Sequence, residues 1–542
     1  MNNHIDVVVV GAGPVGLLTA IELTLAGARV LVLERLATAS MASKAMGIGP
    51  LGCEALQRRG MADSIAVAEA RTFAAIKQFT QQTGGPDLRG RESKFTGHFA
   101  GLSLIRKDAQ KEPQRRARPV DQQAVEAMLA DRARSLGIEV RRECDVTNFV
   151  QQEDAVDVKW VSPAGASQIR CSYLVGCDGG RSSIRKMAGF DFPGTAPTMT
   201  MYQAVAEIDH PERLLPSGWH RTPGGVFSYG PFPGRLVMLD FSGPPEDRQA
   251  PVTPDEIEAV LRRVSGADVR VKALESGSRW TDNTRLADSY RKGRVLLAGD
   301  AAHVHTPFGG QGLGLGLVDA ANLGWKLAAV VRGEMPDSLL DTYTAERRPI
   351  AEAVLANTLA QMAIMRPDPQ AGAIRDIVAK LMQFDDVNRF IGEIMSGLSI
   401  RYDLGSERDD VGRLSGDRPI RHGGADVPLY DLMQDGMGVL LDATSDGKAS
   451  RLVASGTLSI RCVTIDKGPS MLIRPDACIA WSGEETDGLQ EALARWFSPA
   501  LDGGRDPNND HFCHGPPHLR SVEQPLKPWS NPSGLPWSRP MP

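Results

Sequence analysis

The chain has 542 residues, of which 42% are hydrophobic and 23% charged, and its formal net charge is −5. This length exceeds the roughly 250–300 residues at which one hydrophobic core stops growing, so we expect two to four domains. The ordinary hydrophobic content and the weakly acidic balance exclude fibres, disordered chains and basic nucleic-acid-binding modules. The seven cysteines include no CxxC pair, which indicates reduced thiols rather than the disulfide framework of a small secreted protein.

The most apolar stretch lies near the N-terminus, between Val7 and Leu33. Two charged residues, Glu22 and Arg29, and several glycines interrupt it, whereas a membrane-spanning helix needs about 20 predominantly apolar residues. The first residues also lack the cationic start of a signal peptide. We therefore expect a cytoplasmic protein without a membrane span.

The same stretch contains the first motif that carries chemistry. A β-branched run over 5–10 predicts a buried parallel strand, and a helix and a second strand ending at Glu34 follow it. Three glycines in the spacing GxGxxG separate the first strand from the helix: Gly11, Gly13 and Gly16. Such glycines let the backbone approach a pyrophosphate at the helix N-terminus, and Glu34 can accept hydrogen bonds from a ribose diol. This βαβ unit predicts dinucleotide binding but does not choose between NAD and FAD.

Two later segments each place an acidic residue at the end of a predicted strand. The first carries Asp178-Gly179 within a DGxxSxxR pattern, and the second carries Gly299-Asp300. A glycine-rich loop over 307–312 and a predicted helix over about 315–331 follow the second segment. Asp300 can hold a sugar-like hydroxyl group, and the loop amides together with the helix N-terminus can stabilise negative charge on a ring.

Together these motifs resemble the single-component FAD-dependent aromatic hydroxylases, the class A flavin monooxygenases typified by para-hydroxybenzoate hydroxylase. The three fingerprints occur in the order of that family, and the resemblance covers about residues 5–365. It also includes Gln122 with Glu126 and Leu129, on a helix predicted over 122–135, and the stretches 319–327 and 343–349. The fold implied is α/β: a Rossmann-like FAD-binding domain with an inserted antiparallel β-sheet that roofs the substrate pocket.

The resemblance also implies roles for individual residues. Contacts with FAD are expected from Gly11, Gly13, Gly16, Glu34, Arg35, Lys44, Gln122, Asp178, Asp300, Pro307, Gly310, Gln311, Gly312 and Leu313. The catalytic loop, expected to lie against the isoalloxazine ring, contains Pro307, Gly309 and Gly310. Asp178 is associated in the family with both FAD and NAD(P)H binding, and the alternative for it is capping of the helix that begins near Ser182.

Three positions depart from the family pattern. Lys44-Ala45 and Leu51-Gly52 stand where family members usually carry arginine-containing pairs, and Gly314 stands where they usually carry asparagine. Lysine can still meet a phosphate, but as a point charge without the bidentate geometry of arginine. We therefore expect FAD binding with a looser loop around the flavin ring.

Alternating hydrophobic runs with Gly-Pro turns between Gly189 and Gly277 predict the antiparallel sheet inserted between the halves of the FAD domain. Its predicted substrate residues are Tyr202, Trp219, Phe227 and Tyr229, although an aromatic residue on a strand is more often part of the core. The predicted domains are FAD binding at 1–188 and 277–365, substrate sheet at 189–276, helical segment and linker at 366–425, thioredoxin-like domain at 426–500, and Pro-rich tail at 501–542.

The thioredoxin-like assignment also comes from resemblance, to the C-terminal domain of phenol and polyketide hydroxylases. Because this region has no CxxC pair, we expect a structural and not a redox domain. The helices predicted over 344–395 fit either subunit pairing or packing on the chain's own core, so the protein is a monomer or a homodimer. No metal site is predicted, since the tail residues His511, Cys513, His514 and His518 lack zinc-finger spacing. His303 is expected to pack and form hydrogen bonds rather than act as a base.

The resemblance implies an enzyme that uses FAD, NAD(P)H and O2 to hydroxylate a phenolic or polycyclic aromatic substrate through a flavin C4a-hydroperoxide. The cofactor carries the difficult chemistry, while the protein orients the substrate and excludes water. Two alternatives stay open: a Baeyer–Villiger or epoxidising oxygenase of polyketide tailoring, and a flavoprotein that oxygenates nothing. No nucleic acid partner is expected.

Overall fold

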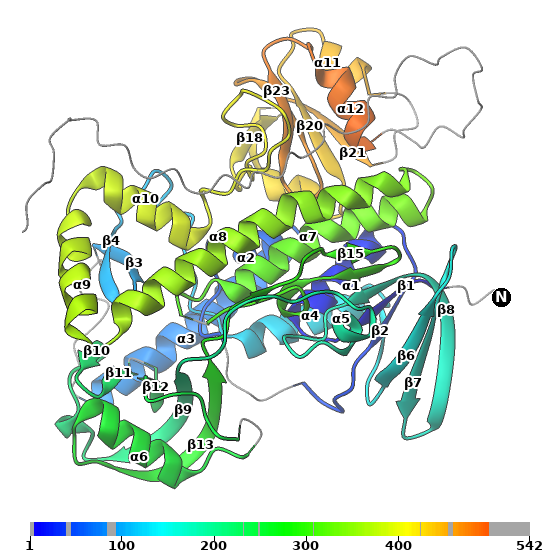
Figure 1. Ribbon diagram of the computed structural model, residues 1–542. Coiled ribbons are helices and arrows are strands. Elements are labelled where there is room, and N and C mark those ends of the chain that lie inside the picture. The colour runs from blue at the N-terminus through cyan, green and yellow to red at the C-terminus, as the bar shows by residue number, and fades with distance from the viewer. Residues whose placement is uncertain are drawn as a thin grey trace, which may run out of the picture. The chain divides into compact units, whose positions relative to one another are not determined.

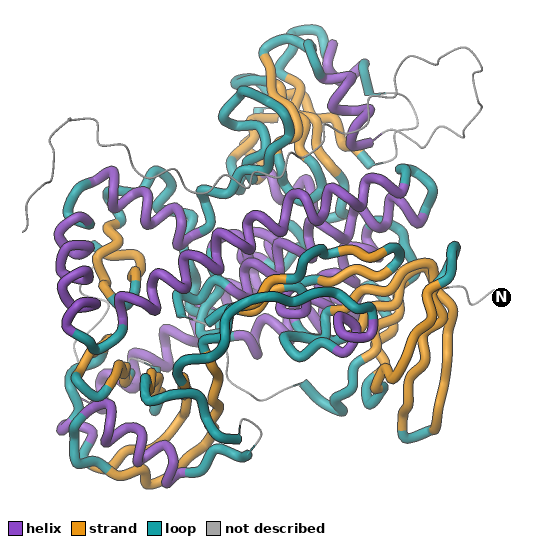
Figure 2. The backbone as a smooth tube through the Cα atoms, in the orientation of Figure 1, coloured by secondary structure: helices purple, strands orange, loops and turns teal. Residues whose placement is uncertain are grey.

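The computed structural model describes residues 5–39, 45–83, 94–230, 232–247, 250–306, 308–422, 424–453 and 459–497. All of them belong to the unit Met1–Ala500. The expectations for Lys44, Pro307 and the Pro-rich tail lie outside the described residues. Helices and strands follow one another along the unit (Figure 1), and the strands gather in separate sheets joined by loops and helices (Figure 2).

A mixed sheet of eight strands forms the centre of the N-terminal part. Its main path runs β15-β16-β8-β1-β2-β5, and β7 joins β8 with β6 beyond it. The neighbours from β16 to β5 are parallel, so the carboxyl ends of β1, β8 and β16 meet at one edge. The strands are β1 (Ile5–Val10), β2 (Val30–Leu33), β5 (Glu139–Arg141), β6 (Asp145–Gln151), β7 (Val156–Ser162), β8 (Gly165–Gly176), β15 (Arg291–Lys292) and β16 (Val295–Leu297).

Two helices pack against each other beside this sheet, α1 (Pro14–Leu25) and α7 (Gly312–Val331). A Cβ atom on Gly324 would lie 2.3 Å from the Cβ atom of Glu22, so glycine permits this close approach. α7 is long and apolar enough to cross a membrane, yet most of its residues are buried inside the protein, as in a core helix. It begins at Gly312, earlier than predicted, because the end of the glycine-rich loop forms its first turn.

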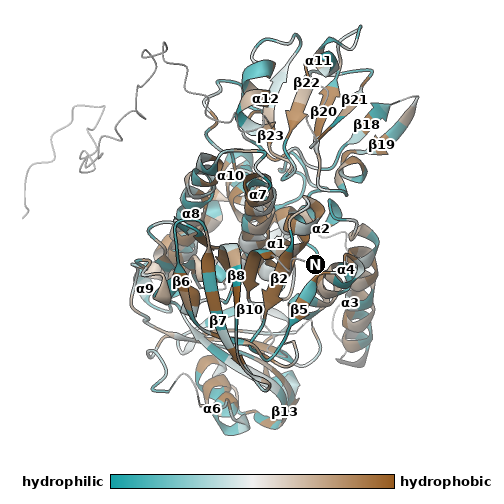
Figure 3. Ribbon diagram, turned by 90° about the vertical axis from the view of Figure 1, so that its right-hand side faces the viewer, coloured by the Kyte–Doolittle hydropathy of each residue, from teal (hydrophilic) through white to brown (hydrophobic). Residues whose placement is uncertain are grey.

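Apolar residues concentrate in the central strands and in the helices that pack on them (Figure 3). The strand and helix of the first βαβ unit and the helix beginning at Gln122 agree with the sequence-based expectation. Two neighbouring helices, α2 and α3, were not predicted. The further helices of this part are α2 (Pro50–Gln57), α3 (Ala62–Thr83), α4 (Gln122–Ser135) and α5 (Ser183–Met187).

The predicted antiparallel sheet is present, with the order β10-β11-β12-β9-β13. Its strands are β9 (Thr200–Asp209), β10 (Gly218–Thr222), β11 (Gly225–Tyr229), β12 (Arg235–Asp240) and β13 (Arg270–Thr281). Helix α6 (Pro254–Ser265) packs on one face and was missed, although Thr253 caps its N-terminus and Gly266 ends it in the left-handed conformation. The last strand continues to Thr281, beyond the boundary expected near Gly277.

A small hairpin, β3 (Phe95–Phe99) and β4 (Leu102–Arg106), was also missed. Three further helices come after α7 in the chain: α8 (Asp341–Met365), α9 (Pro369–Leu381) and α10 (Asp385–Ser396). They hold the hairpin in place, because the Asn388 amide donates to the carbonyl of Leu104 and accepts from the backbone N–H of Arg106, both at 2.8 Å. The expected break in the helical segment, near Pro367 and Pro369, separates α8 from α9.

The C-terminal part has its own four-stranded sheet, in the order β21-β20-β22-β23. The hairpin of β22 and β23 supplies two of its strands. Its elements are β18 (Pro419–His422), β19 (Ala425–Pro428), β20 (Gly438–Asp442), α11 (Lys448–Arg451), β21 (Ile460–Thr464), β22 (Ser470–Ile473), β23 (Ile479–Gly483) and α12 (Leu489–Phe497). A short ladder of β14 (Arg285–Leu286) and β17 (His303–Val304) lies before α7 in the chain.

Candidate functional site

A cavity of about 1710 Å³ brings the three motifs together. It exceeds the roughly 300–1,000 Å³ of most ligand pockets, so it has room for a dinucleotide and a second, planar molecule. Gly309 of the predicted catalytic loop lines it. So do these predicted FAD-binding residues: Gly11, Gly13, Glu34, Arg35, Gln122, Asp178, Asp300, Gly310, Gln311, Gly312 and Leu313.

The first glycine loop fits the pyrophosphate of a dinucleotide. Gly11 has a φ of 105°, and a Cβ atom there would lie 2.5 Å from the carbonyl oxygen of Cys177. Gly13 has no neighbour within 4 Å of a built Cβ, which leaves open space beside the N-terminus of α1. Gly16 does not line the cavity: a Cβ on it would lie 1.9 Å from the carbonyl oxygen of Gly11, so it contributes by letting helix and loop pack closely.

Glu34, at the end of β2, completes this end of the cavity. Its two carboxylate oxygens accept backbone N–H groups of Ala12, at 2.7 Å, and Leu36, at 2.9 Å. Each oxygen keeps a second lone pair, which can accept from a ribose hydroxyl. The loop and this carboxylate therefore fit the adenosine diphosphate half of FAD.

Asp178 caps α5 and also lines the cavity. One oxygen, Oδ2, caps α5 by accepting the backbone N–H groups of Ser183, at 2.7 Å, and Ile184, at 3.2 Å. The other oxygen, Oδ1, is buried without a hydrogen-bond partner among the described residues, although Asp178 lines the cavity. A buried oxygen without a partner is costly, so Oδ1 is suited to accept a hydrogen bond from a ligand.

The third motif presents a carboxylate and a helix N-terminus to the cavity. Asp300 is exposed there, and Gly309 and Gly310 adopt φ values of 90° and 67° that suit glycine. The Gln311 side chain donates to the carbonyl of Ile394 at 2.9 Å and accepts from Asn357 at 2.8 Å. These bonds tie the loop to α10 and α8, so it is held firmly although Gly314 replaces the family's asparagine.

Gln122, the first residue of α4, lines the same cavity. Its amide donates to Glu126 at 2.8 Å, which leaves its carbonyl oxygen available to a ligand. Glu126 lines the cavity too.

The substrate side of the cavity differs from the sequence-based expectation. Of the four predicted substrate residues, Trp219 lines it. Tyr202 and Phe227 are instead buried in the core between the sheet and α6, where Tyr229 also packs. Successive strand residues point to opposite faces, and sequence alone does not show which face α6 covers. The residues of the sheet that line the cavity are Met201, Gln203, Trp219, Val237, Arg279, Trp280 and Thr281.

Two further aromatic residues were missed. His98 from β3 and Phe308 from the glycine-rich loop meet Trp219, with ring centroids 5.4 Å apart for His98–Phe308 and 5.0 Å for Trp219–Phe308. A weakly apolar hairpin gives no pattern that announces a pocket, so His98 could not be found from the sequence. The three rings give the cavity an aromatic wall beside the loop.

A buried ionic group supports the loop from behind. Asp319 of α7 is fully buried and accepts from His303 Nε2 at 2.6 Å and from Arg347 Nε at 2.7 Å. Burial alone would raise the pKa of Asp319, but Arg347 and His303 hold it below its usual value. His303 thus packs and hydrogen-bonds, in line with the expectation that it is not a base.

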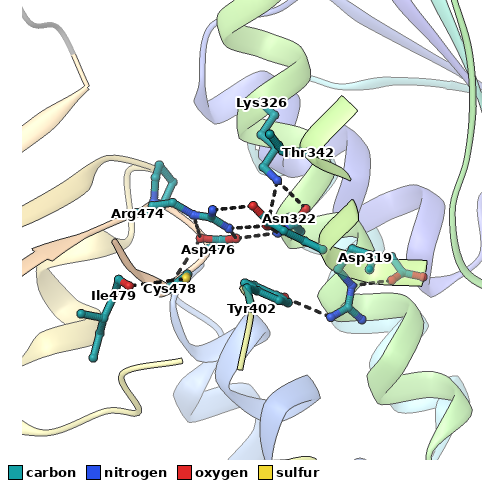
Figure 4. A network of polar contacts seen from close by, with 12 residues as sticks. Asp319, Asn322, Lys326, Thr342, Tyr402, Arg474, Asp476, Cys478 and Ile479 are labelled. Atoms are coloured by element: carbon teal, nitrogen blue, oxygen red, sulfur yellow. Dashed lines mark hydrogen bonds and ion pairs between the residues drawn. The ribbon is translucent and has the colours of Figure 1, made fainter. Parts of the chain in front are cut away.

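The same helices are joined to the C-terminal part by a second buried ionic network, drawn in Figure 4. Arg474 binds both carboxylate oxygens of Glu346 at 2.8 Å and also binds Asp476. Lys326 donates to Glu346 at 2.9 Å, and the amide of Asn322 donates to Asp476 at 2.9 Å. The stretches 319–327 and 343–349, noted as family-like, therefore supply ion pairs that fix α7 and α8 to the C-terminal part.

Comparison with known proteins agrees with this architecture. The family model described as "FAD binding domain" matches residues 4–358, and "Aromatic-ring hydroxylase, C-terminal" matches residues 409–500. The chain is 39% identical to a 12-dehydrotetracycline 5-monooxygenase/anhydrotetracycline 6-monooxygenase of Streptomyces rimosus, over 91% of this chain and 99% of that protein. It is 37% identical to a rifampicin monooxygenase of Streptomyces venezuelae, over 92% of this chain and 100% of that protein.

Among solved structures, the OxyS anhydrotetracycline hydroxylase from Streptomyces rimosus superimposes with a TM-score of 0.79. The alignment covers 92% of this chain and 99% of that one, at 37% identity. The GxGxxG, DG and GD motifs, one cavity that joins them and the matched C-terminal domain together place this chain in the family of FAD-binding aromatic-ring hydroxylases, as an FAD-dependent monooxygenase.

Proposed function

We propose that the protein hydroxylates a planar, oxygen-bearing polycyclic aromatic compound of the polyketide type, with NAD(P)H and O2 as co-substrates. The observation that carries this proposal is the single cavity of about 1710 Å³, which continues from the FAD motifs to an aromatic wall. Relatives named for anhydrotetracycline and rifampicin support the substrate class.

FAD, when bound, supplies the reduction of O2 and the transfer of one oxygen atom to the substrate. The chain's own residues bind, orient and exclude water. We assign the adenosine end to Gly11, Gly13 and Glu34, with Arg35 and Gln122 along the cofactor. Asp178 and Asp300 would accept hydroxyl groups through their free carboxylate oxygens. Negative charge on the flavin ring would be stabilised by the backbone amides at the start of α7, because they lie at a helix N-terminus. These are the amides of Gly310, Gln311, Gly312 and Leu313.

The substrate site is proposed to lie between the antiparallel sheet and the loop that contains Phe308. Trp219 remains a proposed substrate residue. Tyr202, Phe227 and Tyr229 are no longer proposed, and side chains on the cavity face of the sheet replace them. Aromatic and aliphatic walls there exclude water, which favours transfer of oxygen to the substrate over its loss as peroxide. Besides Trp219, the proposed members are Met201, Gln203, Val237 and Trp280.

We propose the predicted domain boundaries, with the substrate sheet extended to Thr281, and we propose that the C-terminal domain is thioredoxin-like. Its support is the strand order β21-β20-β22-β23, with β20 and β21 parallel and the other pairs antiparallel, and with α12 after the last strand. Its two described cysteines, Cys462 and Cys478, are unpaired, which fits a structural role. We further propose a cytoplasmic monomer or homodimer.

The test is to purify the protein, titrate it with FAD, and measure NADPH and O2 consumption with anhydrotetracycline, rifampicin and hydroxyanthraquinones. The proposal expects a yellow holoenzyme whose NADPH oxidation is stimulated by one of these compounds and yields a product heavier by one oxygen. Trp219→Ala should lower this turnover, and Tyr229→Phe, on the other face of the sheet, is the matched control. A product from Baeyer–Villiger insertion, or tight FAD binding with no oxygenated product, would contradict hydroxylation.

A further inference from the structure

His98 lines the cavity as part of the aromatic wall, and its imidazole ring has a polar edge. It lies on β3, next to the turn at Ala100 and Gly101, whose φ values are 51° and 72°. The ring centroid lies 5.8 Å from that of Trp219 and 5.4 Å from that of Phe308. His98 therefore stands between the sheet that roofs the cavity and the loop at the flavin end.

The hydrogen bonds of the hairpin determine which ring nitrogen carries the proton. The backbone N–H of Gly101 donates to Nδ1 of His98 at 3.3 Å, so Nδ1 is an acceptor. The neutral ring then carries its hydrogen on Nε2. Nε2 has no hydrogen-bond partner among the described residues. The atom is not enclosed by protein, and His98 lines the cavity.

The surroundings keep this ring neutral. Burial and the nearby Arg375 guanidinium lower the pKa of His98 to about 4. Arg375 is itself fixed, because it donates to the carbonyl of Ala100 in the same turn. The Gln361 side chain accepts the backbone N–H of Ala100 at 3.0 Å, so the turn is held from both α8 and α9. A neutral imidazole in a rigid turn is a directional N–H donor and not a cation.

We propose that His98 selects and orients the substrate by donating its Nε2 hydrogen to a carbonyl or phenolic oxygen of the polycyclic ring system. The inference rests on the proposed function, because it names the recognition of that substrate class. Trp219 and Phe308 would contact the faces and edges of the rings. The Nε2–H of His98, fixed by the hairpin, offers a hydrogen bond in one direction and so favours one orientation of the molecule. His98 thereby determines specificity and regiochemistry, while the oxygen-transfer chemistry stays with the cofactor.

The test uses the oxidised holoenzyme and a pair of three-ring probes, 1,8-dihydroxyanthraquinone and anthracene, whose binding is followed by perturbation of the flavin absorbance. His98→Leu removes the donor and should weaken binding of the dihydroxyanthraquinone about tenfold, the effect of one unsatisfied hydrogen bond. Anthracene, which has no oxygen, should bind the variant and the wild type alike.

Two polar variants show whether the position of the donor matters. His98→Gln can place an amide N–H near the site of Nε2 and should restore binding to within about threefold of wild type. His98→Asn places its amide near the site of Nδ1 and should behave like the leucine variant. This pair is similar in size and polarity, so it remains informative even where His98→Leu fails to fold. FAD content and the thermal unfolding midpoint check that each variant is intact.

The proposal is overturned when His98→Leu binds the dihydroxyanthraquinone as wild type does, when it weakens both probes equally, or when glutamine and asparagine act alike. Failure of the wild type to bind the dihydroxyanthraquinone overturns it as well. Because the measurement needs no turnover, its failure can be distinguished from failure of the proposed function. A protein that binds through His98 but never oxygenates would contradict the hydroxylase proposal and leave this one standing.

Discussion

Replacing Arg474 by methionine tests whether the buried ionic network holds the C-terminal domain on the FAD-binding domain. Arg474 is fully buried and binds Glu346, which is 6% exposed, and Asp476, which is 2% exposed. With Lys326 the group contains two positive and two negative charges, so Arg474→Met leaves one buried negative charge uncompensated. Breaking a buried pair in this way costs about 3–5 kcal/mol.

The assay is equilibrium unfolding in urea, followed by tryptophan fluorescence. Trp325 and Trp496 report on this network directly, because the Arg474 guanidinium lies 5.4 Å and 4.5 Å from their ring centroids. The free energy of unfolding obtained from this fluorescence transition should fall by about 3–5 kcal/mol in Arg474→Met. It should fall by less in Arg474→Lys, which keeps the charge but loses the bidentate geometry.

A matched control comes from an exposed ion pair of the same domain, Arg421–Asp426, whose side chains are 51% and 63% exposed. Arg421→Met should change stability by less than about 1 kcal/mol, because water screens such pairs. The reasoning is refuted if Arg474→Met is no more destabilising than Arg421→Met.

Three further predictions follow from the same structure. Gly16→Ala should prevent stable folding, since its Cβ would overlap a backbone oxygen. Gly13→Ala should fold with an unchanged melting temperature but lose most of its FAD affinity in a fluorescence titration. Equal behaviour of the two variants would contradict the roles assigned to Gly13 and Gly16. Phe227→Ala should cost about 3–5 kcal/mol of stability, because the ring is fully buried, while Trp219→Ala should leave stability nearly unchanged and raise the KM for the aromatic substrate. The pKa of Glu346 is lowered by Arg474 and Lys326 against the effect of burial, so its stabilising contribution is complete above the unfolded pKa of about 4.3 and is lost as pH falls towards the folded pKa. Melting temperatures measured from pH 7 to pH 3 should therefore stay level down to about pH 5 and then drop, and the drop should be less steep in Glu346→Gln. An equal drop in both proteins would exclude Glu346 as the source of the pH dependence.

The sequence was sufficient for features that depend on local chemistry. The first βαβ unit could be predicted because a β-branched strand, three spaced glycines and a terminal Glu34 each constrain the backbone nearby. The same holds for the strand that ends at Leu297, shortly before Asp300, and for the helix that begins at Gln122. The glycine positions followed too, since Gly11 requires a positive φ and Gly16 a close approach of helix and loop.

Features that depend on distant contacts could not be predicted. Which face of the antiparallel sheet lines the cavity is decided by α6, which covers Tyr202 and Phe227 and leaves Trp219 for the pocket. His98 becomes a site residue only because α8, α9 and α10 hold its hairpin against the cavity. The family-like stretch around Glu346 gave no sign of its partner Arg474, 128 residues later in the chain.

The most direct test of the central claim is a single turnover experiment under 18O2, with the FAD-loaded protein, NADPH and the aromatic substrate that stimulates NADPH oxidation most. Product mass spectrometry measures how many labelled oxygen atoms the substrate gains. An FAD-dependent hydroxylase predicts one 18O atom, bound to an aromatic carbon of the product. An oxygenated product without 18O, whose new oxygen would then come from water, would contradict it.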